Sequence, residues 1–190
     1  ILTKNQGKYK HISFNADQMH ELRIAAWMHD IGKVTTPVEV VEKAKKLQTI
    51  FDRIQYVDLR ICFIIEQMEK SFQNKKIKIL QNGSDPKKIS DLDGEQKIKR
   101  AELMEIRDFI NQCNNPGEFL EDEKIARLED ISKMTWIDFD GNSQSFLDDD
   151  EVLNLSIRRG SITESERKKM QNHAAVTLKM LKKIPFTKKL

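Results

Sequence analysis

The stretch AAWMHDIGKVTTP, residues 25–37, places an imidazole next to a carboxylate directly after a run with helical spacing. In that run apolar residues recur at steps of three and four, and His29 falls on the same stripe, which consists of Leu22, Ala25, Ala26 and His29. Asn15, with Gln18 three residues later, has the form of a capping box that starts the helix, and Gly32 is a residue type that commonly ends one. The pattern therefore predicts a helix that delivers His29 to the interior of the fold.

The composition is that of a globular protein, with 38% hydrophobic and 33% charged residues among 190. No apolar run approaches the roughly 18 residues that cross a bilayer, and no charged-then-apolar leader is present. We therefore expect a cytoplasmic protein without a membrane segment, and any membrane anchor would belong to a longer parent protein.

The charges nearly balance, because 33 Lys and Arg residues stand against 30 Asp and Glu residues, for a formal net charge of +3. Aromatic residues that could stack on bases are not interleaved with the lysine clusters, which favours a solvated surface over a nucleic-acid-binding one. We therefore expect no nucleic acid polymer as a partner. The clusters are Lys75, Lys76 and Lys78, and then Lys182, Lys183, Lys188 and Lys189.

Helical patterns dominate the rest of the chain and predict an all-α fold. After a second helix start at Thr36, Pro37 and Glu39, the apolar residues advance by alternating steps of three and four, as in a coiled coil: Leu47, Ile50, Ile54, Val57, Ile61, Ile64 and Met68. A turn signal at 83–86 precedes a partner stripe formed by Leu103, Ile106, Ile110 and Cys113. The pattern predicts an antiparallel helical hairpin over 47–114, whose seam, if exposed, is a candidate homodimer interface.

A shorter helix around 122–134 is expected next, followed by an acidic loop at 138–150. The loop begins like a calcium-binding EF-hand, with oxygen-bearing side chains at alternate positions, but Ser143 occupies the position that needs a glycine, and Asp149 the position of the bidentate glutamate. An ordinary acidic loop is therefore favoured over a calcium site.

The final helix is predicted to start with a capping box at Thr163 and Glu166 and to run towards Leu181. Its expected inward stripe carries a second histidine and consists of Met170, His173, Ala174, Thr177, Leu178 and Leu181. A lone histidine on such a stripe is more often a satisfied core residue than a ligand, and His29 and His173 can each be explained in that way.

The combination of residues at the end of the first helix favours a site instead. Asp30 follows His29 directly, and Lys33 lies just beyond. Imidazole and carboxylate together suit iron, manganese or zinc, and a nearby ammonium can hold an anionic substrate against the metal. The arrangement indicates phosphoester hydrolysis.

The string HDIGK at residues 29–33 is the signature of HD-domain metal-dependent phosphohydrolases, and the surrounding sequence resembles the HD-GYP branch, which cleaves the bacterial messenger cyclic di-GMP. A second block, residues 159–173, resembles the KPG-x-LT-x-EE segment of that family and its next metal-binding histidine. The resemblance implies a single, partial HD-type domain over 1–190. It would be a helical bundle whose core is formed by 1–46 and 150–190, with the long hairpin in a helical insertion at 47–149.

The resemblance also implies the roles of individual residues. His29, Asp30 and His173 would be metal ligands in a binuclear or trinuclear centre, usually of iron or manganese, with Asp30 bridging two metals. Asp30 and Lys33 would be catalytic, and Lys33 would bind the scissile phosphate. The lysine of the KPG segment is replaced by Arg158 and Arg159, and we expect Arg159 to bind substrate in its place.

Two parts of the family pattern are missing from the chain, namely an early histidine ligand and the later HHE-x-x-DG-x-GYP block. We therefore expect a fragment of a bacterial signal-transduction protein with upstream sensory domains. Its intact form would hydrolyse cyclic di-GMP or a related phosphodiester, whereas the fragment itself would bind metal weakly and have little activity. The alternative is a catalytically degenerate HD module that binds nucleotide, regulates and dimerises.

Overall fold

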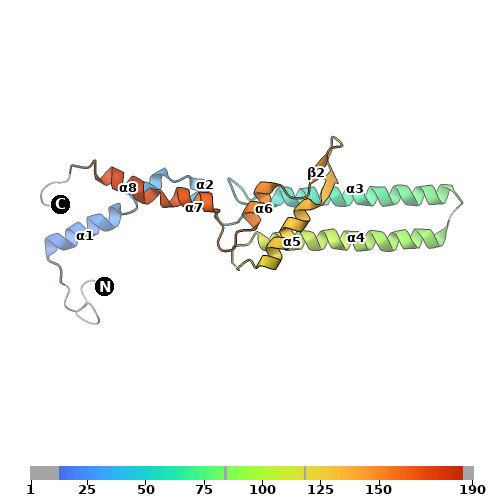
Figure 1. Cartoon of the computed structure of the whole chain (residues 1–190), viewed down its shortest axis with the longest axis horizontal. Helices are drawn as coiled ribbons and strands as arrows, with labels where there is room; N and C mark the ends of the chain where they lie inside the picture. The colour runs from blue at the N-terminus through green and yellow to red at the C-terminus, as the bar shows by residue number, and fades with distance from the viewer. Residues whose placement is uncertain (1–12, 84, 118, 186–190) are drawn as a thin grey trace. The chain divides into compact units, whose positions relative to one another are not determined.

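The computed structural model describes residues 13–83, 85–117 and 119–185 (Figure 1). Most of these residues are helical, and the strands form one two-stranded sheet, which confirms the all-α class. Contacts divide the chain into two compact units: unit 1 comprises Ile1–Val41 and Glu164–Leu190, and unit 2 comprises Glu42–Thr163. None of the helices in the described part of the chain is long and apolar enough to span a bilayer.

Two helices of 28 residues each dominate unit 2, α3 (Ile54–Gln81) and α4 (Pro86–Cys113). Figure 1 shows them side by side. The carboxylate of Asp85 accepts hydrogen bonds from the first backbone amides of α4, and Gly83 has a φ of 108°, which favours glycine. The two helices flank the segment in which a turn is predicted at 83–86, and Ser84 of that segment lies outside the described residues. The interpretation of this pair as an insertion in an HD domain stays a prediction.

The apolar seam between α3 and α4 differs in part from the predicted one. Ile50 is 91% exposed, because α3 begins only at Ile54 and the preceding residues do not follow the period of the helix. Farther along, Ile65 and Phe72 belong to the seam, and the buried residues of the two helices are Val57, Ile61, Ile65, Phe72, Phe109, Ile110 and Cys113. Because this seam is already covered within the chain, a homodimer would have to use other residues.

The remaining elements of unit 2 complete its core. They are α5 (Asp122–Lys133), β1 (Thr135–Ile137), β2 (Ser143–Ser145) and α6 (Asp149–Leu155). The apolar core also includes residues of this part of the chain, namely Leu128, Ile131, Phe146, Leu147 and Leu155. The helix expected near 122–134 is confirmed, whereas the two strands were not predicted, because three-residue segments with mostly exposed side chains give no periodic signal.

The first part of the acidic loop, 138–142, is the turn of the antiparallel β1–β2 hairpin, and the rest contains β2 and the start of α6. The carboxylate of Asp138 accepts hydrogen bonds from the backbone amides of Asp140 and Asn142, at 3.0 and 2.8 Å, and from the side-chain amide of Gln144 at 2.7 Å. The hydrogen bond from the Gln144 side chain is the main cause that lowers the pKa of Asp138. Asp138 therefore stabilises its own turn, as expected of an ordinary loop.

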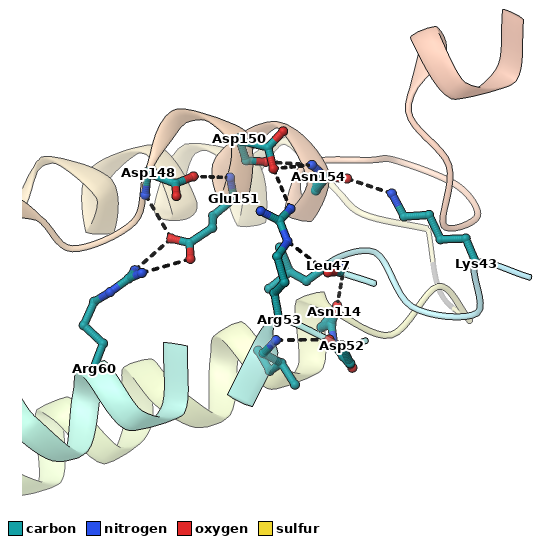
Figure 2. Close-up of polar contacts among 11 residues, drawn as sticks. Lys43, Leu47, Asp52, Arg53, Arg60, Asn114, Asp148, Asp150, Glu151 and Asn154 are labelled. Carbon is teal, nitrogen blue, oxygen red and sulfur yellow. Dashed lines mark hydrogen bonds and ion pairs between the residues drawn. The ribbon is translucent and has the colours of Figure 1, made fainter. Parts of the chain in front are cut away.

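A polar framework joins α6 to the start of α3 and the end of α4 (Figure 2). The guanidinium of Arg60 donates two hydrogen bonds to the carboxylate of Glu151, at 2.8 and 3.0 Å, and Glu151 also accepts from the amide of Asp148 at 2.9 Å. Asn114, at the end of α4, accepts from the amide of Leu47 at 2.8 Å. Each of these polar groups has a hydrogen-bond partner, and the hydrogen bond from Leu47 to Asn114 holds the segment before α3 in place.

Lys46 is a buried lysine at the base of the helix pair, with 1% of its surface exposed. Its ammonium donates to the carbonyl oxygen of Leu155 at 3.0 Å. Burial lowers the pKa of Lys46 from its ordinary value of 10.5, because removal from water disfavours the charged form. For the same reason burial raises the pKa of the Cys113 thiol from 9.0.

We expect Lys46→Met to change the pH dependence of stability. The folded amine loses its proton at a lower pH than the unfolded one, so the unfolded state binds more protons in the window below 10.5 and the wild-type free energy of unfolding rises with pH there. The variant lacks this rise, so the wild type should gain stability relative to it as the pH increases towards 10.5, measured by urea unfolding. For Cys113→Ala we expect the opposite trend above pH 9.0: the wild type should lose stability relative to this variant as the pH rises. The reason is that the wild-type thiol keeps its proton to a higher pH in the folded state than in the unfolded state. If the free energies of unfolding of the wild type and Lys46→Met differed by the same amount at every pH in this range, the lowered pKa of Lys46 would be wrong.

Unit 1 contains α1 (Ala16–Met28), the 3-10 helix η1 (Ile31–Thr35), α2 (Val38–Val41), α7 (Glu164–Gln171) and α8 (His173–Leu181). The capping box predicted at the start of α1 is confirmed: the amide of Gln18 donates to the side chain of Asn15 at 2.8 Å, and the reciprocal hydrogen bond is 3.0 Å long. The predicted final helix is interrupted at Asn172. In the described parts of unit 1 the buried residues are Gly32, Thr36, Val40 and Thr177.

Two predictions about the first helix are wrong. No residue of α1 is buried, and the stripe expected to face inward lies open, because nothing in the described chain covers it; this stripe is Leu22, Ala25, Ala26 and His29. Gly32 does not adopt the left-handed conformation that ends a helix, since the glycines with positive φ are Gly83, Gly141 and Gly160. Gly32 lies inside η1, where its backbone contacts α8.

Candidate functional site

The contact between η1 and α8 positions the candidate site. The amide of Gly32 donates a hydrogen bond to the hydroxyl of Thr177, at 2.9 Å, in a buried position. A Cβ atom at Gly32 would lie only 2.2 Å from the carbonyl oxygen of His173. Glycine is therefore needed for this close backbone approach, which holds Asp30 against the first turn of α8.

Two imidazoles from distant parts of the chain face the carboxylate of Asp30. The Nε2 atom of His29 lies 3.0 Å from Oδ2 of Asp30, and the Nε2 atom of His173 lies 3.4 Å from Oδ1. Each histidine thus faces a different oxygen of the same carboxylate. The structure brings together the three residues singled out in the sequence as metal ligands.

The other nitrogen of each ring fixes the tautomer. Nδ1 of His29 lies 2.6 Å from the carbonyl oxygen of Ala26, and Nδ1 of His173 is hydrogen-bonded to the carbonyl oxygen of Met170. A carbonyl oxygen only accepts, so each Nδ1 must carry a proton and donate it. In a neutral imidazole Nε2 then presents a lone pair to the carboxylate, and two lone pairs at this distance repel. The arrangement suits a cation between nitrogen and oxygen, which either a proton on the ring or a metal ion can supply.

The donor set is chemically suited to a divalent metal. Imidazole nitrogen and carboxylate oxygen are ligands of iron, manganese and zinc, and metal-bound histidines commonly donate their second N–H to a backbone carbonyl, as both do here. Two ligands about 2.1 Å from one metal and at right angles to each other are about 3 Å apart, close to the separations at Asp30. Among the described residues, however, no group of three or more His, Cys, Asp or Glu side chains is already arranged to hold a metal ion. A metal would therefore draw the three side chains together and need further ligands.

Lys33 adds a positive charge to this cluster. Its ammonium donates to Oδ2 of Asp30 at 2.6 Å, and this hydrogen bond is the largest cause that holds the pKa of Asp30 below its ordinary value of 3.8. The charges of His29, Lys33 and His173 act in the same direction, against partial desolvation. Asp30 is thus held in the anionic form that a metal ligand must have.

The cluster lies open to solvent. The side chains of His29, Asp30 and His173 are 66%, 33% and 21% exposed, so the prediction that His29 is buried is wrong. Lys33 is half exposed and can leave Asp30 for an incoming anion. Arg159, the expected substrate-binding arginine, is exposed and belongs to unit 2. The positions of the two units relative to one another are not determined, so the structure does not place Arg159 beside Lys33.

Sequence reasoning missed the role of Thr177. It stands four residues after His173 on the stripe expected to face inward, and a hydroxyl at that position was the available signal for a polar contact. The structure shows that this hydroxyl accepts the hydrogen bond from Gly32. Thr177 therefore positions the η1 segment rather than filling a core.

No protein-family model, curated protein or solved structure matches this chain. The case for a function consequently depends on the geometry around Asp30 and on the resemblance of the two sequence blocks to HD phosphohydrolases.

Proposed function

We propose that unit 1 forms a metal-dependent phosphohydrolase centre of the HD type, which in a bacterial signalling protein acts on cyclic di-GMP or a related phosphodiester. The observation that carries the proposal is the convergence of two Nε2 atoms on the two oxygens of Asp30 while both Nδ1 atoms are used by backbone carbonyls. Such an arrangement suits a metal ion as well as a proton, and the residues involved resemble the HD signature and its second histidine.

In this proposal His29, Asp30 and His173 hold one or more divalent ions, iron or manganese. A bound ion of this kind would supply a hydroxide near neutral pH and stabilise the charge that develops on the phosphoryl oxygens. The histidines are oriented for the task because their Nδ1 hydrogen bonds fix the rings. With the rings fixed, the Nε2 lone pair of each histidine points towards the carboxylate of Asp30.

Lys33 is the residue proposed to bind the substrate. Its ammonium pairs with Asp30 at present, but the side chain is flexible and half exposed. A phosphate oxygen can therefore replace the carboxylate as its acceptor, and the ammonium charge then stabilises the additional negative charge of the transition state. The same charge attracts an anionic substrate towards the open cluster.

The alternative is a regulatory HD module that binds nucleotide without turnover. It is favoured by the exposure of the cluster, since phosphoryl-transfer sites usually exclude water. The ion pair that occupies Lys33 favours it as well, because an inactive module has no need of a free ammonium.

Substitutions at Asp30 and Lys33 should separate metal binding from phosphate binding. We expect Asp30→Asn to lower Mn²⁺ affinity by about 10- to 100-fold, because it removes the carboxylate that both imidazoles face. In the intact parent protein, which would supply the missing ligands, Lys33→Gln should leave Mn²⁺ affinity nearly unchanged but lower kcat/KM for bis-p-nitrophenyl phosphate by about 10- to 100-fold. Mn²⁺ binding is measured by calorimetry and turnover by release of nitrophenolate. His20→Ala, an exposed histidine of α1, is the matched control and should change neither quantity.

The outcomes distinguish the two functions. Mn²⁺ binding that depends on Asp30, without turnover of either bis-p-nitrophenyl phosphate or cyclic di-GMP by the intact parent protein, would favour the regulatory module. Equal Mn²⁺ affinity in the wild type, Asp30→Asn and His20→Ala would contradict a metal centre at this position.

A further inference from the structure

The half of α3 that lies beyond the apolar core is a basic surface. Residues 70–82 contain four lysines and no Asp or Glu. On a helix, Lys70, Lys75 and Lys78 span about 12 Å along the axis, at a rise of about 1.5 Å per residue. This segment of α3 therefore concentrates positive charge over a short distance.

These three lysines line a surface hollow of about 630 Å³ in unit 2. The same face of α3 contributes uncharged hydrogen-bonding groups to the hollow, from Gln67, Ser71 and Asn74. At one end Ile137 of β1 borders it, where the side-chain amide of Gln67 donates to the carbonyl oxygen of Ile137 at 2.9 Å. The hollow is thus a corner between α3 and the β1–β2 hairpin, and no carboxylate is among its described lining residues.

Among the nearby carboxylates, Glu66 lies one turn before Lys70 on α3 and is exposed, whereas three others are engaged elsewhere. Glu69 pairs with Arg100, and Asp93 pairs with Lys76 at 2.5 Å. Asp138, next to Ile137, accepts hydrogen bonds within its own turn. The lining of the hollow therefore has one sign of charge, and a concave surface of one sign strengthens the attraction for a counter-ion.

The ammonium groups are also free to bind. In the described part of the chain, Lys70 and Lys78 form no ion pair, and Lys75 lies over the ring of Phe72, 5.0 Å from its centroid. Asp91 and Glu95 of α4 line a separate hollow that Lys75 and Lys78 also border, so they neutralise these two lysines only in part.

We propose that this corner binds a small anion with several phosphate groups, such as a nucleoside triphosphate, at a site separate from Asp30. Three lysines within about 12 Å match a compact oligophosphate, and the amide and hydroxyl groups can donate to its oxygens. A nucleic acid strand fits less well, because no aromatic side chain is among the described residues that line the hollow. A lipid surface fits less well because Ile137 is the one apolar residue of the described lining, and β1 closes one end.

The probe for this site is inorganic tripolyphosphate, titrated into the full chain and followed by calorimetry at about 50 and 150 mM NaCl, because salt weakens an electrostatic site. The site variant is Lys70→Gln/Lys75→Gln/Lys78→Gln. The control variant, Lys97→Gln/Lys168→Gln/Lys179→Gln, removes the same charge from exposed lysines elsewhere. We expect the site variant to weaken binding by about 10-fold or more, and the control by less than about 2-fold.

Three outcomes would overturn the proposal. The first is an equal loss in both variants, which would show general attraction to a basic protein. The second is the absence of tripolyphosphate binding at millimolar concentration. The third is that a single-stranded oligonucleotide or phosphatidylserine vesicles bind through these lysines while tripolyphosphate does not bind. That result would assign the surface to a macromolecular partner. None of these results bears on metal binding at Asp30, so this test and that of the proposed function fail independently.

Discussion

Gly32→Ala should separate η1 from α8 and dismantle the candidate site. The added Cβ would lie 2.2 Å from the carbonyl oxygen of His173, and 2.6 Å from both the amide nitrogen and the hydroxyl oxygen of Thr177. Two of these three atoms belong to the backbone, so no side-chain rotation relieves the overlap. We expect a cost of about 3 kcal/mol in the stability of unit 1, at the upper end for overpacked positions. The measurement is urea unfolding followed through the imidazole NMR signal of His173.

Gly94→Ala is the matched control for this substitution. Gly94 lies in α4, and a methyl group added there would have no atom within 4 Å, so alanine should stabilise the helix by about 0.5–1 kcal/mol. Thr177→Val tests the contact without steric overlap, because it removes only the acceptor of the Gly32 amide and should cost about 1–2 kcal/mol. Thr177→Ser keeps the acceptor and should remain close to the wild type. If Gly32→Ala left the His173 signal and its unfolding midpoint unchanged, the close approach of η1 and α8 would be wrong.

Glu151→Ala should strongly destabilise unit 2. The carboxylate of Glu151 is 4% exposed and accepts hydrogen bonds from Arg60 and from the amide of Asp148 (Figure 2). Its removal leaves the guanidinium of Arg60, which is 18% exposed, with the carbonyl oxygen of Phe146 as its remaining described acceptor. Breaking a buried ion pair from one side costs several kcal/mol, because the remaining charge is uncompensated. We expect about 3 kcal/mol, measured by urea unfolding followed by circular dichroism.

Arg158→Ala provides the comparison for an exposed pair. Arg158 and Asp122 are 51% and 81% exposed, so loss of their ion pair should cost less than about 0.5 kcal/mol. Arg60→Ala together with Glu151→Ala completes a double-mutant cycle, and we expect the two effects to be strongly non-additive. A Glu151→Ala protein as stable as Arg158→Ala would show that the buried pair contributes little.

The signals that the sequence predicted correctly are local. The capping box at Asn15 and the helix near 122–134 each depend on residues within one or two turns of backbone, whose hydrogen bonds form with near neighbours. Heptad spacing likewise indicated the long helices α3 and α4, although it started the seam too early at Ile50. The residues that form such hydrogen bonds are neighbours in the sequence. A cap or a short helix can therefore be predicted from the sequence without knowledge of the fold.

Burial was predicted less well, because it depends on what packs against a face. The stripe of α1 has the spacing of an inward face, yet nothing in the described chain covers it and His29 is exposed. The β1–β2 hairpin was missed because its strands are short and its turn is stabilised by Asp138 rather than by an apolar pattern. Periodicity indicates which residues share a face, but not whether a partner covers that face.

The amino-acid sequence alone indicates a mostly helical chain that carries His29, Asp30, Lys33 and His173 in two blocks far apart along its length. That these blocks meet is a property of the folded chain. The reason is the contact at Gly32, where the absence of a side chain lets the backbone of η1 reach α8, and where the hydroxyl of Thr177 accepts a hydrogen bond. That contact sets both imidazoles against one carboxylate. Neither its closeness nor the exposure of the resulting cluster can be read from spacing along the chain.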